Sequence, residues 1–162
     1  MPRNIIFSGA ITGATLALAY GTLAHLINWI DTRESRFGKA SSDPFQLEAL
    51  GNAAADIDAS LVQYFADIDR AYDIVDSGRA LTFSERADIR RNQVRSSQRA
   101  VEAADYVFRL SGGSQLQKSN PAQRHWRDAQ AALHHVQNLQ GKMMQAWGLN
   151  RFGHPVPKAV KI

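Results

Sequence analysis

The sequence has 162 residues and contains no cysteine, which excludes several kinds of site at once. A disulfide framework, a thiolate metal site and a cysteine nucleophile are all ruled out, and nothing points to an oxidising compartment. We therefore expect a cytoplasmic protein. Proline is scarce, with five residues in the chain, and aromatic residues make up only 9% of it. With its abundant alanine, this composition favours a single helical domain that has its own core.

A large excess of charge of one sign is also missing, because 19 Lys and Arg face 15 Asp and Glu. The resulting charge of +4 permits anion binding but does not demand nucleic acid, and we expect no nucleic-acid partner. One stretch is rich in arginine: Arg86, Arg90, Arg91, Arg95 and Arg99. We expect these side chains on a solvated helix face, partly paired with Glu85 and Asp88. A face that contacts phosphate or nucleic acid is the alternative, which no interleaved aromatic or glycine residues support.

Residues 5–30 carry no formal charge and are long enough to span a bilayer, which takes about 20 residues. Arg3 precedes them, and Ala17-Leu18-Ala19 imitates a signal-peptidase site. The segment is rich in small residues, however, and includes His25 and Asn28. These features favour a helix buried in a tight bundle, with no membrane contact. A membrane anchor and a cleaved signal peptide remain as alternatives.

Four helices are predicted from apolar spacing and from signals at their ends. The first covers about 5–31, with an extension to 37 left open, and Asp43-Pro44 caps the start of the second. The second helix ends at Gly78, and its apolar stripe consists of Leu47, Leu50, Ala54, Ile57, Leu61, Tyr64, Ile68, Tyr72 and Val75.

The third helix opens with the capping box Thr82 to Glu85 and ends near Leu110. Its inner stripe consists of Val94, Ser97, Val101, Ala104 and Phe108. A polar loop, 111–120, leads to Asn120-Pro121, which starts a fourth helix that ends near Trp147, before Gly148. The expected fold is all-α, an antiparallel four-helix bundle over 1–150 with a flexible basic tail over 151–162.

Histidines gather in the fourth predicted helix, in RHWRDAQAALHH, residues 124–135. The apolar face of this helix is expected to carry Trp126, Leu133, Val136 and Gln140, continued by Met143, Met144 and Trp147. A second stripe consists of Arg124, Asp128, Ala131 and His135. His134 lies between the faces, about 100° from His135. Two histidines so placed do not easily bind one ion, so no metal site is expected.

The segment GGSQLQKSNPAQRHWRDAQAALHH, residues 112–135, resembles part of the C-terminal helical domain of the acyl-CoA dehydrogenase superfamily. It is most similar to the branch of two-component flavin-dependent monooxygenases, in which a histidine follows an Arg-Asp pair on one helix. His135 lies seven residues after Asp128 and matches that placement, whereas His134 misses it by one. The stretches SGAITGATLALAYGTLA, RESRFGKASSDPFQLEAL and SGRALTFSERADIRRNQVRSSQRAVEAADYVFRLSGG resemble the preceding helices in the same order.

The resemblance implies an oxidoreductase domain whose parent enzyme hydroxylates an aromatic or related substrate through a peroxyflavin. A flavin reductase would supply reduced FMN or FAD. His135 would be catalytic, because an imidazole can deprotonate a phenol or hydrogen-bond a peroxide at neutral pH. Other implied cofactor contacts are Ser111, Gly112, Gly113, Ser114, Arg124 and Asp128. The resemblance also implies a homo-oligomer, a tetramer or dimer, formed through the bundle.

The sequence departs from classical acyl-CoA dehydrogenases, which use a catalytic glutamate near the end of this domain or ahead of its first helix. No acidic residue follows Asp128 or precedes Asp31, so oxygenase chemistry is favoured. A dehydrogenase domain and a non-catalytic oligomerisation module remain as alternatives. Arg33 and Arg36 flank the position of the family's linker arginine. The family's N-terminal helical and middle β domains are absent from this chain, so we expect no tight flavin binding and no turnover from it alone.

Overall fold

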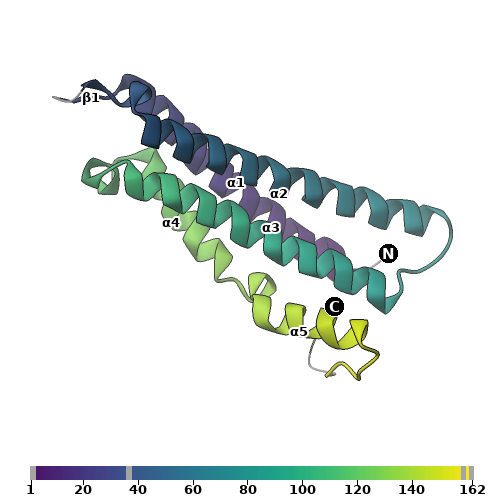
Figure 1. Ribbon diagram of the computed structural model, residues 1–162. Coiled ribbons are helices and arrows are strands. Elements are labelled where there is room, and N and C mark those ends of the chain that lie inside the picture. The colour runs from purple at the N-terminus through teal and green to yellow at the C-terminus, as the bar shows by residue number, and fades with distance from the viewer. Residues whose placement is uncertain (1–2, 36–37, 158–159, 161–162) are drawn as a thin grey trace.

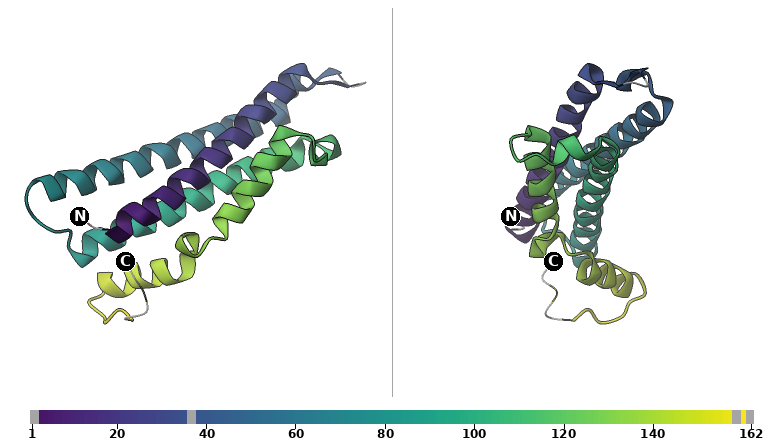
Figure 2. Two further views of the ribbon diagram at one scale, coloured as in Figure 1. Left: turned by 180° about the vertical axis from the view of Figure 1, so that it is seen from behind. Right: turned by 90° about the vertical axis from the view of Figure 1, so that its left-hand side faces the viewer.

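The computed structural model describes residues 3–35, 38–157 and 160, and these residues form a bundle of helices (Figure 1). Three long helices lie side by side: α1 (Arg3–Thr32), α2 (Pro44–Asp76) and α3 (Phe83–Leu110). The shorter α4 (Pro121–Leu133) packs against α1 and α3, and α5 (Gln140–Arg151) packs on α3. Successive long helices run in opposite directions, which confirms the antiparallel bundle (Figures 1 and 2).

Short elements join the helices. The strands β1 (Glu34–Ser35) and β2 (Gly38–Lys39) pair antiparallel, and η1 (Ala40–Ser42) leads into α2. Two further 3-10 helices, η2 (Gly113–Leu116) and η3 (Val136–Asn138), flank α4. The β1–β2 hairpin and the connection from α3 to α4 lie at the same end of the bundle, away from both chain ends (Figures 1 and 2).

The helix starts that the sequence predicts are all present. The side chains of Asp43 and Asn120 each accept a hydrogen bond of 2.9 Å from the amide two residues later, and each is followed by proline. Thr82 and Glu85 form the reciprocal capping box. Such caps satisfy amides that have no partner within the helix, so short polar motifs fix where α2, α3 and α4 begin.

The apolar segment at the N-terminus forms a helix of the core. The structure contains one helical segment that is long and apolar enough to cross a membrane by length and composition, Ile5–Thr32, among the residues it describes. The side chains of this segment that are buried in the main core are Leu16, Ala19, Leu23, Leu26 and Ile30. The expected buried bundle helix is therefore what the structure shows.

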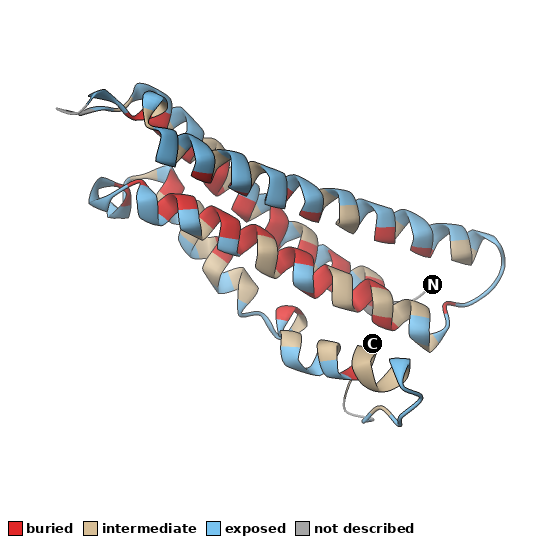
Figure 3. Cartoon of the chain, viewed as in Figure 1, coloured by how far each residue is buried: buried red, intermediate tan, exposed pale blue. Residues whose placement is uncertain are grey.

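The inner stripe predicted for α3 is buried throughout. The stripe on α2 is less complete, since Ile57 is fully buried but Leu47 and Tyr72 are 49% and 46% exposed. Figure 3 shows why: α2 lies at one side of the bundle, and much of its length is exposed.

The fourth predicted helix is broken, which corrects the sequence prediction. α4 ends at Leu133, and α5 continues past Gly148 to Arg151. Trp126 and Leu133 pack against the core as expected, but Val136 is 67% exposed because it follows the break. In α5, Ala146 is buried with Ala87 of α3, and the residues that pack around them are Phe83, Met143, Trp147, Val156 and Val160.

The arginine face of α3 is only partly solvated, which is a second correction. Arg90 is 1% exposed because it lies four residues before Val94 and so shares the inner stripe of the helix. Asp88 does pair with an arginine of this face, Arg91, at 3.5 Å. Glu85 instead pairs with Arg79, at 2.7 Å.

Candidate functional site

His135 lies at the break where α4 gives way to η3. Its backbone is extended, with φ −61° and ψ 141°, and its Nδ1 accepts a hydrogen bond of 3.2 Å from the Gln137 amide. Because Nδ1 accepts this bond, the neutral ring carries its proton on Nε2. The side chain is exposed, so it presents an N–H donor at the surface of the bundle.

His134 differs from His135 because the helix ends before them, not because the two point about 100° apart on one helix, as the sequence analysis expected. It is the C-terminal cap of α4, and its Nδ1 lies 2.8 Å from the carbonyl oxygen of Gln130. The two neighbouring imidazoles are therefore tied to opposite sides of the break. No group of three or more metal-ligating side chains gathers here or elsewhere in the described part of the chain.

Buried polar side chains lie beneath the break. Asn138 is 2% exposed and donates to the carbonyl oxygen of Ala132 at 2.9 Å. Arg90 donates to the carbonyl oxygen of Gln137 at 2.5 Å. Burial lowers the pKa of Arg90 to about 10, which leaves it charged at neutral pH. The sequence analysis placed Arg90 on the solvated face of the helix, although its spacing of four residues from Val94 indicated the buried face.

Arg124 and Asp128 form an ion pair across one turn of α4, at 3.7 Å. Arg127 also contacts Asp128, at 3.1 Å. The Arg124 side chain is 76% exposed, so the pair stabilises the helix by about 0.3–0.5 kcal/mol at most. With His125 and Lys118, the pair lines a hollow of about 520 Å³ between α4 and α1.

A larger hollow, about 660 Å³, lies at the hairpin end of the bundle and is lined by Arg33, Lys39 and Gly112 among others. Arg33 donates to the Ser111 carbonyl at 3.0 Å, and its guanidinium lies 4.5 Å from the centre of the Trp29 ring. Gly112 has φ +84°, a conformation that other residues rarely adopt. Arg36, the other candidate linker arginine, lies outside the described residues.

The loop residues predicted to contact cofactor differ among themselves. Ser111 is buried, and its amide already donates to the carbonyls of Phe108 and Val107, so it has no amide to offer a ligand. Gly112, Gly113 and Ser114 are exposed. The structure does not bring this loop and His135 into one pocket, because α4, 13 residues or about 20 Å long, separates them (Figure 1).

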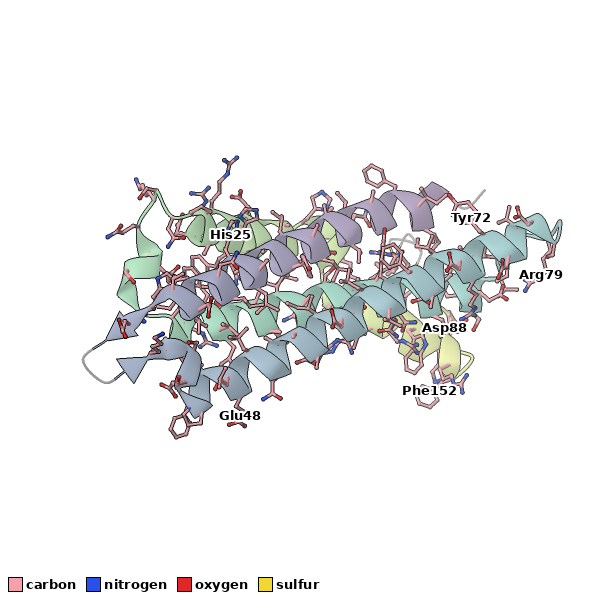
Figure 4. The ribbon with its side chains drawn as sticks, turned by 90° about the horizontal axis from the view of Figure 1, so that it is seen from above. His25, Glu48, Tyr72, Arg79, Asp88 and Phe152 are labelled. Carbon is pink, nitrogen blue, oxygen red and sulfur yellow. The ribbon has the colours of Figure 1, made fainter. Side chains whose placement is uncertain are left out.

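A second pair of histidines was not anticipated. His25 of α1 faces α4, where its ring lies 4.8 Å from that of His125 (Figure 4). The Nδ1 of His125 is 2.9 Å from the Pro121 carbonyl oxygen. Close approach is possible because Gly21 leaves space beneath the His125 ring. The small residue at position 21 was the only sequence signal for this contact.

The helical bundle belongs to a known family of domains. Residues 7–140 match the family described as acyl-CoA dehydrogenase, C-terminal domain, and the chain belongs to it. Over 154 residues it is 39% identical to a pigment production hydroxylase of Rhodococcus erythropolis, and the aligned segment covers 94% of this chain and 39% of the relative. It is 32% identical over 158 residues to HsaA, the oxygenase subunit of a flavin-dependent monooxygenase of Mycobacterium tuberculosis, covering 96% of this chain and 40% of the relative.

Solved structures agree with this assignment. The crystal structure of the HsaA monooxygenase of M. tuberculosis superimposes with a TM-score of 0.87 at 32% identity, over 98% of this chain and 40% of that one. XiaF of Streptomyces, solved with FADH2 and glycerol, has a TM-score of 0.88 at 22% identity, over 94% of this chain and 39% of that one, and shows the shared fold. The chain thus spans about two fifths of the length of these relatives.

Proposed function

We propose that this chain provides the C-terminal helical domain of a flavin-dependent monooxygenase that hydroxylates an aromatic or related substrate. The observation that carries the proposal is the 32–39% identity, over nearly the whole chain, to an oxygenase subunit and a hydroxylase. The lack of any acidic residue after Asp128 argues against a dehydrogenase that uses a glutamate base near the end of this domain. A flavin reductase as partner and a cytoplasmic location follow from the same proposal.

The residues of the hairpin-end hollow fit the phosphate of a flavin, which would be the cofactor of a neighbouring copy of the chain if His135 serves the chain's own flavin, because α4 separates the two sites by about 20 Å. Arg33 and Lys39 supply positive charge beside Gly112, which has no side chain to obstruct an anion. Arg33 is held toward this hollow by its bond to Ser111 and by the Trp29 ring. A reduced flavin, when bound, supplies the electrons that activate oxygen.

His135 would contribute through its Nε2–H. The Nδ1 cap leaves the neutral ring as a hydrogen-bond donor toward solvent, so it can donate to a developing negative charge on oxygen. To act as a general base, the ring would have to lose the hydrogen bond from the Gln137 amide to Nδ1, or move its proton from Nε2 to Nδ1. The donor role is therefore the one that this geometry favours. Asp128 and Arg124 brace α4 at its exposed face, about one and a half and two and a half turns before the break.

The bundle exposes large apolar side chains that suit assembly with copies of itself or with other domains. On α1 and α2 these are Phe7, Tyr20, Ile27, Phe45, Leu47, Val62, Phe65 and Tyr72. Since burying apolar surface drives association, we propose that the chain forms a homo-oligomer through the bundle.

A domain exchange tests the proposed function. This chain replaces the matching C-terminal segment of the M. tuberculosis HsaA oxygenase subunit, and product from that enzyme's own substrate is measured with a flavin reductase present. The expected result is hydroxylated product. A well-folded chimera that still binds reduced flavin but forms no product would contradict the proposal and favour a non-catalytic helical module.

A further inference from the structure

The break between α4 and α5 is not caused by a glycine or a proline. Between Pro121 and Gly141 the chain has neither glycine nor proline, and its many Ala, Gln, Leu and Arg residues are good helix formers. The sequence accordingly predicts one continuous helix to Trp147. Because α4 nevertheless ends at Leu133, we infer that side-chain hydrogen bonds made at the break end it.

Asn138 makes the first of these contacts. Its Nδ2 donates to the Ala132 carbonyl at 2.9 Å, which in a continuous helix would accept from the amide of Val136. The same Nδ2 donates to Thr15 Oγ1 at 3.0 Å, and Oδ1 accepts from Ser97 at 3.2 Å. The buried amide of Asn138 is thus fixed by α1 and α3 while it satisfies the last turn of α4.

Arg90 makes the second contact. Its guanidinium donates to the Gln137 carbonyl and to Gln93 Oε1, both at 2.5 Å, and the contacts described for it include no carboxylate. Neutral acceptors offset only part of the cost of burying such a charge. Ser8 adds a bond of 2.9 Å to Gln137 Oε1, so Gln137 is held from two helices.

We propose that Arg90 and Asn138 are positioning residues for His135, which hold the break open so that the imidazole caps η3 and presents its Nε2–H. The link is short, because Gln137 accepts from Arg90 through its carbonyl and donates its amide to His135 Nδ1. Asn138 also donates its own amide to the His135 carbonyl, at 2.8 Å. The catalytic meaning of this positioning rests on the proposed function, whereas the structural claim does not.

Nuclear magnetic resonance of the 162-residue chain tests the structural claim. His135 and Leu139, which flank η3, both have an extended backbone, with ψ 141° and 116°. Their Cα chemical shifts report this conformation, and the ring ¹⁵N shifts of His135 report Nδ1 as an acceptor. In Asn138→Leu, Asn138→Ala and Arg90→Met, we expect both residues to become helical and the Nδ1 signal to lose its acceptor character. Arg90→Lys retains a donor for the Gln137 carbonyl, and we expect its shifts to match those of the wild type.

Ser96→Ala is the matched control, because it removes a buried serine hydrogen bond of α3, to Gln63, that involves neither Asn138 nor the break. Its shifts at His135 and Leu139 should match the wild type. The proposal is overturned if the Asn138 and Arg90 variants keep both residues extended, or if Ser96→Ala alters them equally. Loss of the whole fold in every Asn138 and Arg90 variant would also overturn it, since these side chains would then serve the bundle rather than the break.

The same variants in the HsaA chimera test the catalytic meaning. We expect kcat to fall about 100-fold in Asn138→Leu and Arg90→Met, with partial rescue in Arg90→Lys, because a misplacement of about 1 Å can have an effect of that size. An inactive wild-type chimera would count against the proposed function, while the resonance data would still decide the positioning. Unchanged kcat with altered resonance shifts would overturn the catalytic meaning alone.

Discussion

Gly21 of α1 lies directly against the imidazole of His125 on α4: a β-carbon at position 21 would be 2.7 Å from His125 Cδ2. The ring cannot move freely, because its Nδ1 lies 2.9 Å from the Pro121 carbonyl oxygen and its face packs on His25. This contact fixes how closely α1 and α4 approach. The distance between these two helices therefore depends on a residue with no side chain.

The first prediction concerns Gly21→Ala. Alanine normally stabilises a helix interior by about 0.5–1 kcal/mol relative to glycine, but overpacking typically costs about 1–3 kcal/mol. We expect Gly21→Ala to lower the free energy of unfolding by about 1 kcal/mol in urea denaturation. Gly51→Ala is the control: it lies in α2 with nothing within 4 Å of its added β-carbon, so it should stabilise. Stabilisation by both changes would disprove the contact.

The starts of the helices could be predicted from the sequence, whereas the end of α4 could not. Local rules placed the starts of α2, α3 and α4, because Asp43, Thr82 and Asn120 act within a few residues of themselves. The end of α4 was not predicted because the hydrogen bonds that hold the break involve distant residues: Arg90 comes from α3, and Asn138 is fixed by Thr15 and Ser97. The identity of His135 as a candidate came from its spacing to the Arg-Asp pair. Its capping of η3 came only from the structure.

A second prediction concerns the buried Asp67 on α2, which is 7% exposed. Burial raises the pKa of this carboxyl, although a hydrogen bond from Asn92 opposes the shift. In the unfolded chain the pKa of an aspartate lies near 3.9, below that of Asp67 in the native state. The native state therefore binds the proton more tightly than the unfolded chain does. As the pH rises from about 4 through the native pKa, this proton is lost and the free energy of unfolding falls. Asp67→Asn should therefore raise Tm more at pH 7 than at pH 3.5.

Thermal unfolding followed by circular dichroism measures this difference. The exposed Asp69→Asn is the control, and its effect on Tm should be small at both pH values. If Asp67→Asn lowers Tm at pH 7 more than at pH 3.5, the carboxylate is stabilised in the native state and this account of Asp67 is wrong.

A third prediction concerns assembly through α2. Val62 and Phe65 are 69% and 57% exposed, and both are large and apolar. If copies of the chain cover this surface, Phe65→Glu should shift the mass measured by light scattering toward the monomer. Glu48→Gln, an exposed polar change on the same helix, is the control (Figure 4). An equally monomeric wild type would contradict association through this bundle.

A fourth prediction concerns the chain on its own. Since the flavin-contacting residues proposed here line an open hollow rather than an enclosed pocket, we expect no hydroxylated product from the purified 162-residue protein, with flavin, reductase and phenolic substrates supplied. Product detected by mass spectrometry at a rate comparable to that of the chimera would show that the bundle holds a complete site.

The most direct test of the central claim compares two neighbouring histidines in the HsaA chimera. His135→Ala removes the Nε2–H donor and should lower kcat by at least about 100-fold, in the range expected for a positioned proton donor. His134→Ala removes a side chain whose hydrogen bond within the described residues is to the Gln130 carbonyl, and it should leave kcat within about twofold. Equal activity in the two variants, or a greater loss in His134→Ala, would contradict the account.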